Sequence, residues 1–442
     1  MVTELTYNRQ ILAAHNQAAN VFTPGAPIDA ISLFRGRDAQ MQMLLEAVSQ
    51  IGQHAIVYGE RGVGKTSLIS VLYELVTQSA LTGFHIAHVN CDVEDTFASL
   101  WRKIFREIQV DSFGKVTTLQ PISLDTPHSL ADHLGDAISP DDIRRLCSLV
   151  DGQLVVIIDE FDQLSGNVEI IRLVANTIKT LSDRRTQVTL ILVGVADTVS
   201  QLVTEHESVE RNLVQIQMPR MSDQETGLII TEGLAALGFT INEGGLAYVC
   251  SLSQGLPASA HRIGLQMAHH MIETNGHMVG RGDVDASLDR VIDRMPQSHL
   301  MDWQSATEGS RKNSLFEVVL IAAALAPRSE QGWFQSNDIL EPFRSITDNG
   351  QYKTNSYSQH LYRLTTQRGT VLERSKFDGH WQFRFRNPSF QSYVLMKGLA
   401  SGRLNGTTLS QFNRSVPAVR PEQQDGPGQT YLLQESRLPR YH

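Results

Sequence analysis

Short apolar runs alternate with longer segments of helical periodicity through the first half of the chain. Each run has the composition typical of a strand buried on both faces of a parallel sheet. The alternation therefore predicts an α/β fold, in which a five-stranded parallel sheet is covered by helices on both faces. The predicted strands are 54–58, 84–90, 154–158, 188–195 and 213–218.

The second half of the chain is mainly helical. Its first part is helical throughout and predicts a small helical lid. The later part has three helical segments and then two strand-like arms around Asp378-Gly379, a strong hairpin signal. Three helices followed by a hairpin predict a winged-helix domain. The predicted divisions are an N-terminal arm or short helix (1–30), the α/β core (31–220), the lid (221–294), a polar linker (295–313), the winged helix (314–400) and a disordered tail (401–442).

The turn after the first apolar run carries the most specific motif, G-x-x-x-x-G-K-T between a strand and a helix. Its glycines let the backbone turn sharply and present N–H groups to phosphate oxygens, and the helix N-terminus adds partial positive charge. Lys65 is expected to reach the β- and γ-phosphates. The predicted nucleotide-binding residues are Gly59, Glu60, Arg61, Gly62, Val63, Gly64, Lys65, Thr66 and Ser67.

A pair of acids ends the third strand. Charged residues at the carboxyl end of such a strand belong at the mouth of an open α/β sheet, where ligands bind. Asp159 is expected to meet a Mg²⁺ ion that is also held by the hydroxyl of Thr66. Glu160 is expected to accept a proton from the water that attacks the γ-phosphate. ATP and Mg²⁺ are therefore the predicted cofactors.

One arginine precedes the fifth strand in a run of acids. In a monomer, Arg211 would pair with Glu207 or Glu210. Alternatively, it projects to the nucleotide of a neighbouring subunit and stabilises transition-state charge as an arginine finger. The second interpretation predicts self-association.

The basic residues concentrate near the C-terminal end. The whole chain has a net charge of −9, but residues 351–400 hold eight basic and two acidic residues. A basic patch on the third helix and the hairpin favours contact with the phosphates of duplex DNA. Winged helices also dock proteins, so that alternative stays open. The predicted DNA contacts are Arg363, Arg368, Arg384 and Arg386.

Cysteine usage and hydropathy point to a reducing cytoplasm. Cys91, Cys147 and Cys250 are widely spaced and form neither a disulfide framework nor a zinc-binding cluster. The longest apolar stretch, residues 318–327, is too short to span a bilayer. We therefore expect no membrane contact.

Taken with these motifs, residues 30–400 resemble the AAA+ ATPases, particularly the origin-recognition and initiator group. The stretch 33–38 (LFRGRD) is similar to the G-R-E box that frames the adenine in that group. The resemblance implies that Asn90 holds the catalytic glutamate inactive until a partner binds. It also places Arg211 at the position of the family's arginine finger.

Two positions depart from the family pattern. The sensor after the fourth strand is usually Asn or Thr, whereas this chain has Asp197. Ala258 stands where a family member often has the second sensor arginine, and Arg262, one turn later, is expected to substitute for it. These departures imply hydrolysis that is slow or depends on a partner, as in a switch.

Two hypotheses of function follow. The first is a DNA-binding ATPase whose nucleotide state controls assembly on DNA, as in replication initiation or transposition. The second is a signalling or defence ATPase in which the same winged helix clamps nucleotide or docks a protein. The basic patch favours the first hypothesis.

Overall fold

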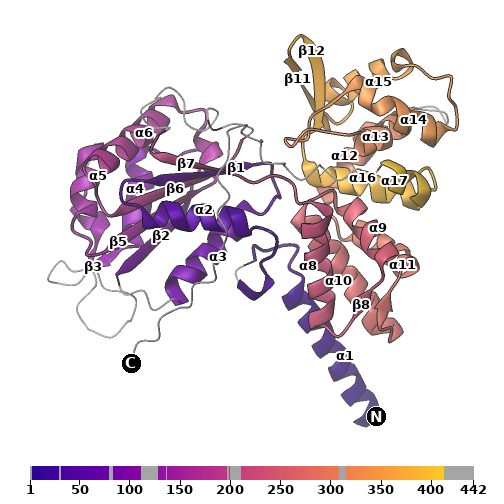
Figure 1. The fold of residues 1–442 in the computed structure, drawn as a ribbon, viewed down its shortest axis with the longest axis horizontal. Helices are drawn as coiled ribbons and strands as arrows, with labels where there is room; N and C mark the ends of the chain where they lie inside the picture. Colours follow the sequence, from indigo (N-terminus) through magenta and orange to yellow (C-terminus); the bar gives the residue numbers. More distant parts are fainter. Residues whose placement is uncertain are drawn as a thin grey trace, which may run out of the picture.

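The computed structural model describes residues 2–28, 31–78, 83–110, 128–135, 137–196, 199, 211–307 and 315–412. Figure 1 shows three parts, with an α/β core on one side and a helical bundle and a mixed unit on the other. We call them the core (residues 31–220), the lid (221–295) and the C-terminal unit (296–412). Helix α1 (Val2–Val21) extends from the lid.

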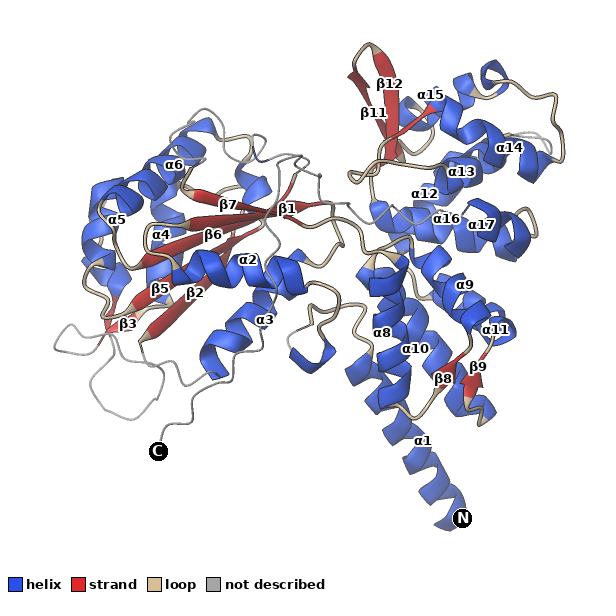
Figure 2. Cartoon of the chain, in the orientation of Figure 1, coloured by secondary structure: helices blue, strands red, loops and turns tan. Residues whose placement is uncertain are grey.

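The core is the predicted five-stranded parallel sheet. Its strand order is β2-β5-β6-β1-β7, and every neighbouring pair is parallel. β1, which leads into the glycine-rich turn, lies between β6 and β7 (Figure 2). The prediction of fold class is therefore confirmed. The strands are β1 (His54–Gly59), β2 (Phe84–Asn90), β5 (Gln153–Asp159), β6 (Val188–Val195) and β7 (Leu213–Gln217).

Two apolar clusters cover the two faces of the sheet. Alternate residues of one strand enter different clusters, as Ile56 and Val57 of β1 do. Helices α2 (Asp38–Ser49) and α3 (Lys65–Gln78) cover one face. The other face is covered by α4 (Phe97–Arg106), α5 (Pro140–Cys147) and α6 (Val168–Asp183). Short elements of the core are η1 (Ile31–Leu33), β3 (Gln109–Val110), β4 (His128–Ser129), η2 (Leu130–His133) and η3 (Phe161–Leu164).

The lid is a helical bundle, as predicted, and α1 packs along its helix α10. Phe22, just after α1, is buried beside Gly233 and Gly264, where any side chain would collide with its ring. The lid contains α8 (Asp223–Ala236), α9 (Glu243–Ser253), α10 (Pro257–Thr274), α11 (Arg281–Asp293), β8 (Thr240–Ile241) and β9 (Met278–Val279).

Residues 316–385 of the C-terminal unit have the predicted order of three helices followed by a hairpin. Leu361 and Leu364 of the helix before the hairpin, and Tyr357 just before that helix, are fully buried, as the sequence pattern predicts. A short additional strand, β10, pairs with the second arm of the hairpin. The elements are α13 (Phe316–Leu325), β10 (Phe334–Gln335), η5 (Ser336–Ile339), α14 (Leu340–Thr347), η6 (Thr354–Ser356), α15 (Ser358–Thr366), β11 (Leu372–Phe377) and β12 (His380–Phe385).

Two predictions about irregular segments are wrong. Helix α12 (Gln297–Thr307) lies in the expected linker, because a few residues such as the buried His299 and Ala306 anchor an otherwise polar helix. Helix α17 (Gly406–Phe412) lies in the tail that was expected to be disordered and buries Leu409. The rest of that tail, 413–442, is outside the described residues.

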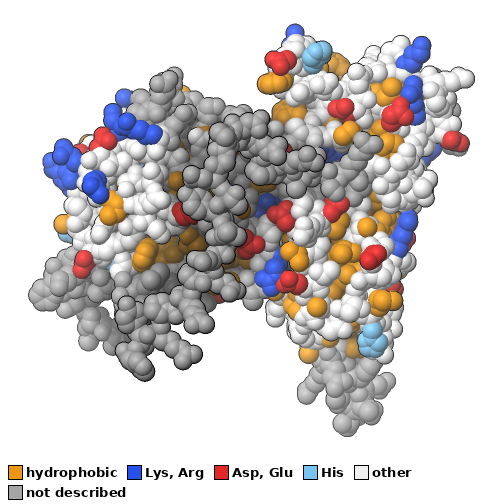
Figure 3. Space-filling model, viewed as in Figure 1, with side chains coloured by type: hydrophobic (Ala, Val, Ile, Leu, Met, Phe, Trp, Pro, Cys, Tyr) orange, Lys and Arg blue, Asp and Glu red, His pale blue; other side chains and the backbone are white. Residues whose placement is uncertain are grey.

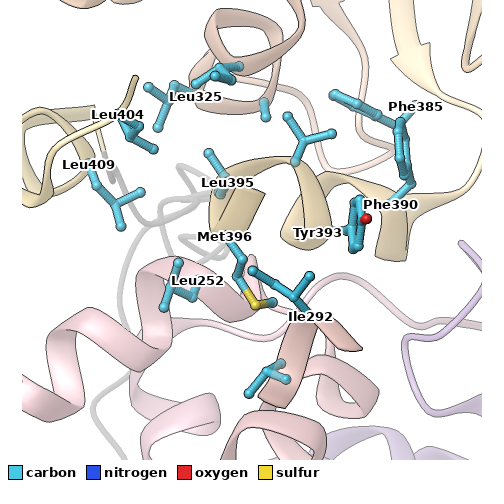
Figure 4. Packing of buried hydrophobic residues seen from close by; sticks show 14 of the residues in the cluster. Leu252, Ile292, Leu325, Phe385, Phe390, Tyr393, Leu395, Met396, Leu404 and Leu409 are labelled. Carbon is cyan, nitrogen blue, oxygen red and sulfur yellow. The ribbon is translucent and has the colours of Figure 1, made fainter. Parts of the chain in front are cut away.

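Helix α16 (Pro388–Ala400) joins the C-terminal unit to the lid. Figure 4 shows Met396 of α16 close to Leu252 and Ile292 of the lid, and α16 contacts both α9 and α11. A single apolar cluster extends from the lid through the C-terminal unit, whereas the clusters of the sheet consist almost entirely of core residues. The lid and the C-terminal unit are therefore packed as one body against the core.

None of the helices in the described part of the chain is long and apolar enough to cross a membrane. Cys91, Cys147 and Cys250 are buried, and their thiols are free.

Candidate nucleotide-binding site

The glycine-rich turn joins the end of β1 to the first residue of α3. Gly59, Gly62 and Gly64 all have positive φ angles, of 151°, 86° and 95°. Gly59 also lies so close to the Met218 carbonyl that a Cβ atom would collide with it. The sequence forms this tight loop because only glycine fits these positions.

A cavity of about 310 Å³ opens beside this loop. The loop, the carboxyl ends of β5 and β6, the start of α10 and residues 23–28 form its walls. The charged side chains that line it come from the loop and from the carboxyl ends of β5 and β6. The loop residues that line it are Arg61, Gly62, Gly64, Lys65, Thr66 and Ser67.

Lys65 is 8% exposed, and its ammonium group donates to the Glu60 carbonyl at 2.8 Å and the Gly59 carbonyl at 3.0 Å. Burial lowers the pKa of Lys65 to about 8, although Asp162 and Asp159 oppose the shift. The ammonium group is thus held at the loop by two neutral carbonyls and is available to a stronger acceptor.

This pKa predicts a pH dependence of nucleotide affinity. Below about pH 7, Lys65 is already protonated in the empty site, so the affinity for ATP should not change with pH. Above about pH 8, Lys65 must take up a proton when ATP binds, so the Kd should rise by up to about tenfold per pH unit. ATP titrations between about pH 7 and pH 9.5 measure this. Lys65→Arg should flatten the profile because arginine does not titrate there. A flat wild-type profile would contradict the prediction.

The acid pair lies at the carboxyl end of β5 and lines the same cavity. The Asp159 carboxylate is buried and accepts from the Glu160 N–H at 2.7 Å, and Glu160 is exposed with a left-handed φ of 55°. Asp162 accepts from the Val195 N–H at 2.8 Å, which joins the ends of β5 and β6. Asn90 is directly opposite Asp159 in the register of β2 and β5.

The side-chain oxygen atoms of Thr66 and Asp159 are suitable ligands for a Mg²⁺ ion. Thr66 and Asp159 line the same cavity, and Mg²⁺ is typically bound through one or two protein ligands, with the remaining positions taken by phosphate and water. The ion would supply charge neutralisation for the transferred phosphate.

Residues 50–202 match the family model described as an AAA domain. This segment is an AAA domain. It contains the glycine-rich loop, Asn90, the acid pair and Asp197, so these predicted residues belong to one recognised domain. No curated protein matches the sequence.

Several solved structures align with most of this chain at low sequence identity. The Aeropyrum pernix ORC2 protein (ADPNP-ADP complexes) is 17% identical, with 87% of this chain and 98% of that chain covered and a TM-score of 0.45. The Aeropyrum pernix ORC1 protein in complex with DNA is 14% identical, with 87% and 97% covered and a TM-score of 0.43. Cdc6p from Pyrobaculum aerophilum is 16% identical, with 88% and 99% covered and a TM-score of 0.41.

Two parts of the cavity outside the AAA domain were missed in the sequence. Residues 23–28 form one wall, held by the Ile28 N–H donating to Ser67 Oγ at 3.1 Å and the Thr23 N–H donating to His261 Nδ1 at 3.2 Å. His261, on α10, also lines the cavity, and burial lowers its pKa to about 4, so the imidazole is neutral. The proline-glycine break at 24–27 was the only signal.

The LFRGRD motif braces the AAA domain in a way the resemblance did not predict. Arg37 is 2% exposed and donates to the Val63 carbonyl of the loop and to the Pro219 carbonyl at the end of the core. Arg37 is not among the residues that line the cavity. Its described contacts therefore support the phosphate loop and do not frame a base.

Arg262, one of the two predicted sensors, and Arg211, the predicted finger, do not line this cavity. Arg262 is absent from the cavity lining, and its guanidinium contacts Met295 Sδ at 3.1 Å. Asp197 is outside the described residues. Arg211 is exposed at the amino end of β7, whereas the loop leaves the carboxyl end of the parallel neighbour β1. Within one chain, Arg211 thus lies at the opposite end of the parallel strands from the glycine-rich loop.

The four predicted DNA contacts have different surroundings in the structure. Arg363 is exposed on α15, and Arg368 stacks on Phe316 with 4.6 Å to the ring centroid. Arg384 pairs with Glu373, and Arg386 is exposed. Arg384 and Arg386 line a second cavity of about 400 Å³, together with Glu60 and Arg61 of the loop. On the face drawn in Figure 3, basic and acidic side chains of the C-terminal unit are interspersed.

Proposed function

We propose that the chain binds ATP with Mg²⁺ and hydrolyses it slowly, as a nucleotide-controlled switch that assembles on DNA. The observation that supports the ATPase part is the convergence of Lys65, Thr66, Asp159 and Glu160 on one cavity of an AAA domain. Lys65 and the backbone N–H groups of the loop would bind the phosphates. Thr66 and Asp159 would bind the metal ion. Glu160 would take the proton of the attacking water.

The architecture suits a switch. The lid and the C-terminal unit form one packed body, and the cavity lies between this body and the core, since Pro257 and Ala258 of the lid line it beside the phosphate loop. A ligand at such a joint contacts both bodies and can change their relative position only through its different affinity for the two arrangements.

A cluster on the hairpin and α15 supports DNA as the partner. Trp381 and Tyr362 are about half exposed, and the Arg374 guanidinium lies between them, 4.6 Å and 4.4 Å from their ring centroids. Phe377, at the hairpin turn, is 64% exposed. Exposed rings interleaved with cations suit a surface that contacts phosphates and bases.

We expect duplex DNA binding that depends on salt and on ATP. The double variant Arg363→Ala/Lys376→Ala should weaken binding and reduce the slope of log K against log salt by about one for each lost phosphate contact. Fluorescence anisotropy over a salt series, with and without ATP, measures both. Arg145→Ala, which removes an exposed cation of the core, is the matched control. Unchanged DNA affinity in the double variant would remove the reason for preferring DNA and favour the signalling or defence alternative.

Arg211 is proposed to act in trans. Arg211 lies at the opposite end of the strands from the nucleotide site of its own chain. An Arg211→Ala chain therefore keeps an intact nucleotide site, and a Glu160→Gln chain keeps an intact arginine finger. Mixing the two inactive variants should therefore restore part of the ATPase activity at mixed interfaces. Steady-state phosphate release against mixing ratio measures this. Activity no higher than that of the separate variants would contradict an intersubunit finger.

A further inference from the structure

A buried ion pair links the phosphate loop to the boundary between core and lid. The Glu60 carboxylate accepts hydrogen bonds from Arg220 Nε at 2.6 Å and from Arg220 Nη2 at 3.3 Å. The side chain of Glu60 is only 7% exposed and that of Arg220 only 5%. Arg220 is two residues before Ser222, which caps the first helix of the lid. Glu60 is therefore fixed from outside the AAA domain match, by a residue at the joint between the two bodies.

The same arginine reaches the C-terminal unit. Arg220 Nη1 donates to Gln391 Oε1 at 2.8 Å, and Gln391 is fully buried near the start of α16. The Gln391 amide in turn donates to Gln254 Oε1 of the lid and, at 2.8 Å, to the Ala324 carbonyl of α13. Three parts of the molecule thus meet at one glutamine.

A second arginine closes the network. Arg328 donates to Gln254 Oε1 at 3.0 Å and to the Ala324 carbonyl at 2.6 Å. The turn that follows passes so close to Glu60 that any side chain at Gly332 would collide with its carboxylate. The C-terminal unit therefore packs directly against the phosphate loop.

The network holds more positive than negative charge. Its described charged members are two guanidiniums, the buried Arg220 and the partly buried Arg328, and one buried carboxylate, Glu60. Burial lowers the pKa of Arg328 to about 9, and repulsion by Arg220 adds to the shift while Glu60 opposes it. Buried charge of one sign is unfavourable until an opposite charge approaches. A triphosphate at the adjoining loop would bring that charge.

The backbone of Glu60 contacts Lys65 of the phosphate loop. Its carbonyl accepts from Lys65 at 2.8 Å, and Lys65 is the residue expected to move to the β- and γ-phosphates. Phosphate binding would therefore act on the backbone of Glu60, the residue whose side chain holds Arg220.

We propose that Arg220 is a positioning residue that holds the phosphate loop through Glu60 and ties it to Gln391, so that ATP binding and docking of the C-terminal unit stabilise each other. This inference rests on the proposed binding of ATP. Because coupling between two equilibria is reciprocal, a change at Gln391, which does not line the nucleotide cavity, must alter ATP affinity.

The test compares two buried polar residues that are neighbours on α16. Gln391→Leu keeps the side-chain size and removes the contact with Arg220. Ser392→Ala removes a hydrogen bond to the Ser253 carbonyl of the same lid but leaves the network intact. Calorimetry gives the ATP affinity of each variant. Hydrogen exchange, with and without ATP, reports the docking of the peptides at 326–333 and 388–395.

In the wild type, ATP should slow exchange in both peptides. Gln391→Leu should weaken ATP binding about tenfold and abolish that protection, and Ser392→Ala should do neither. Wild-type affinity together with retained protection in Gln391→Leu would overturn the proposal. Equal losses in both variants would also overturn it, because they would indicate a general effect of weakened packing.

The wild-type measurement keeps the proposal falsifiable if Gln391→Leu does not fold. ATP binding to the wild type without any change of exchange at 388–395 would overturn the coupling alone. No ATP binding to the wild type would instead overturn the proposed function.

Discussion

Lys65→Ala is expected to weaken ATP binding about a hundredfold. Its ammonium group is buried beside the phosphate loop, and the substitution removes charge-assisted hydrogen bonds to the phosphates, which together contribute about 3 kcal/mol. It also removes the two bonds that hold the empty loop, to the carbonyls of Gly59 and Glu60. Calorimetric titration with ATP in the presence of Mg²⁺ measures the loss.

Lys179→Ala is the matched control, since it removes an exposed lysine from α6 of the same core. It should bind ATP as the wild type does. Comparable melting temperatures for the two variants would show that the fold is intact. Wild-type affinity in Lys65→Ala would count against the assignment of the phosphate loop.

The sheet and the phosphate loop were predictable because their signals are local. A continuously apolar run such as 154–158 has few alternatives to a doubly buried strand, and the loop motif specifies its own backbone. The ends of β5 and β6 then follow from the parallel order, which places their carboxyl ends beside the loop.

The hairpin shows why the surroundings of a residue were harder to predict. Phe383 and Phe385 are buried and alternate with Gln382 and Arg384, as the period of a strand requires. Alternation distinguishes the two faces of a strand, but it does not tell whether the polar face meets solvent, DNA or another part of the chain. In the structure, Arg384 faces Glu373 and the cavity beside Glu60.

The buried network could not be predicted, because it depends on tertiary contacts between distant segments. Glu60, Arg220 and Gln391 each have ordinary sequence neighbours, and 160 to 171 residues separate Arg220 from its two partners. Polar residues within a helix such as α16 are usually read as its solvent face, yet Gln391 is fully buried. Such a residue is retained in a core only with hydrogen-bond partners, which the structure supplies.

Glu160→Gln is expected to bind ATP and to hydrolyse it about a hundred- to ten-thousandfold more slowly, the usual contribution of a general base. The amide has nearly the same shape as the carboxylate but cannot take a proton from water. The Glu160 N–H bond to Asp159 is made by the backbone, so the substitution leaves the end of β5 in place. ATP affinity should therefore remain close to that of the wild type, and the nucleotide should stay intact.

Single-turnover hydrolysis of radiolabelled ATP separates binding from chemistry in this variant. Glu169→Gln, an exposed glutamate at the start of α6 in the same core, is the matched control and should hydrolyse ATP at the wild-type rate. A Glu160→Gln chain that turns over normally would exclude Glu160 as the base. Asp162 would then be the carboxylate to test, because it lines the same cavity, although its bond to the Val195 N–H gives it a role at the end of β6.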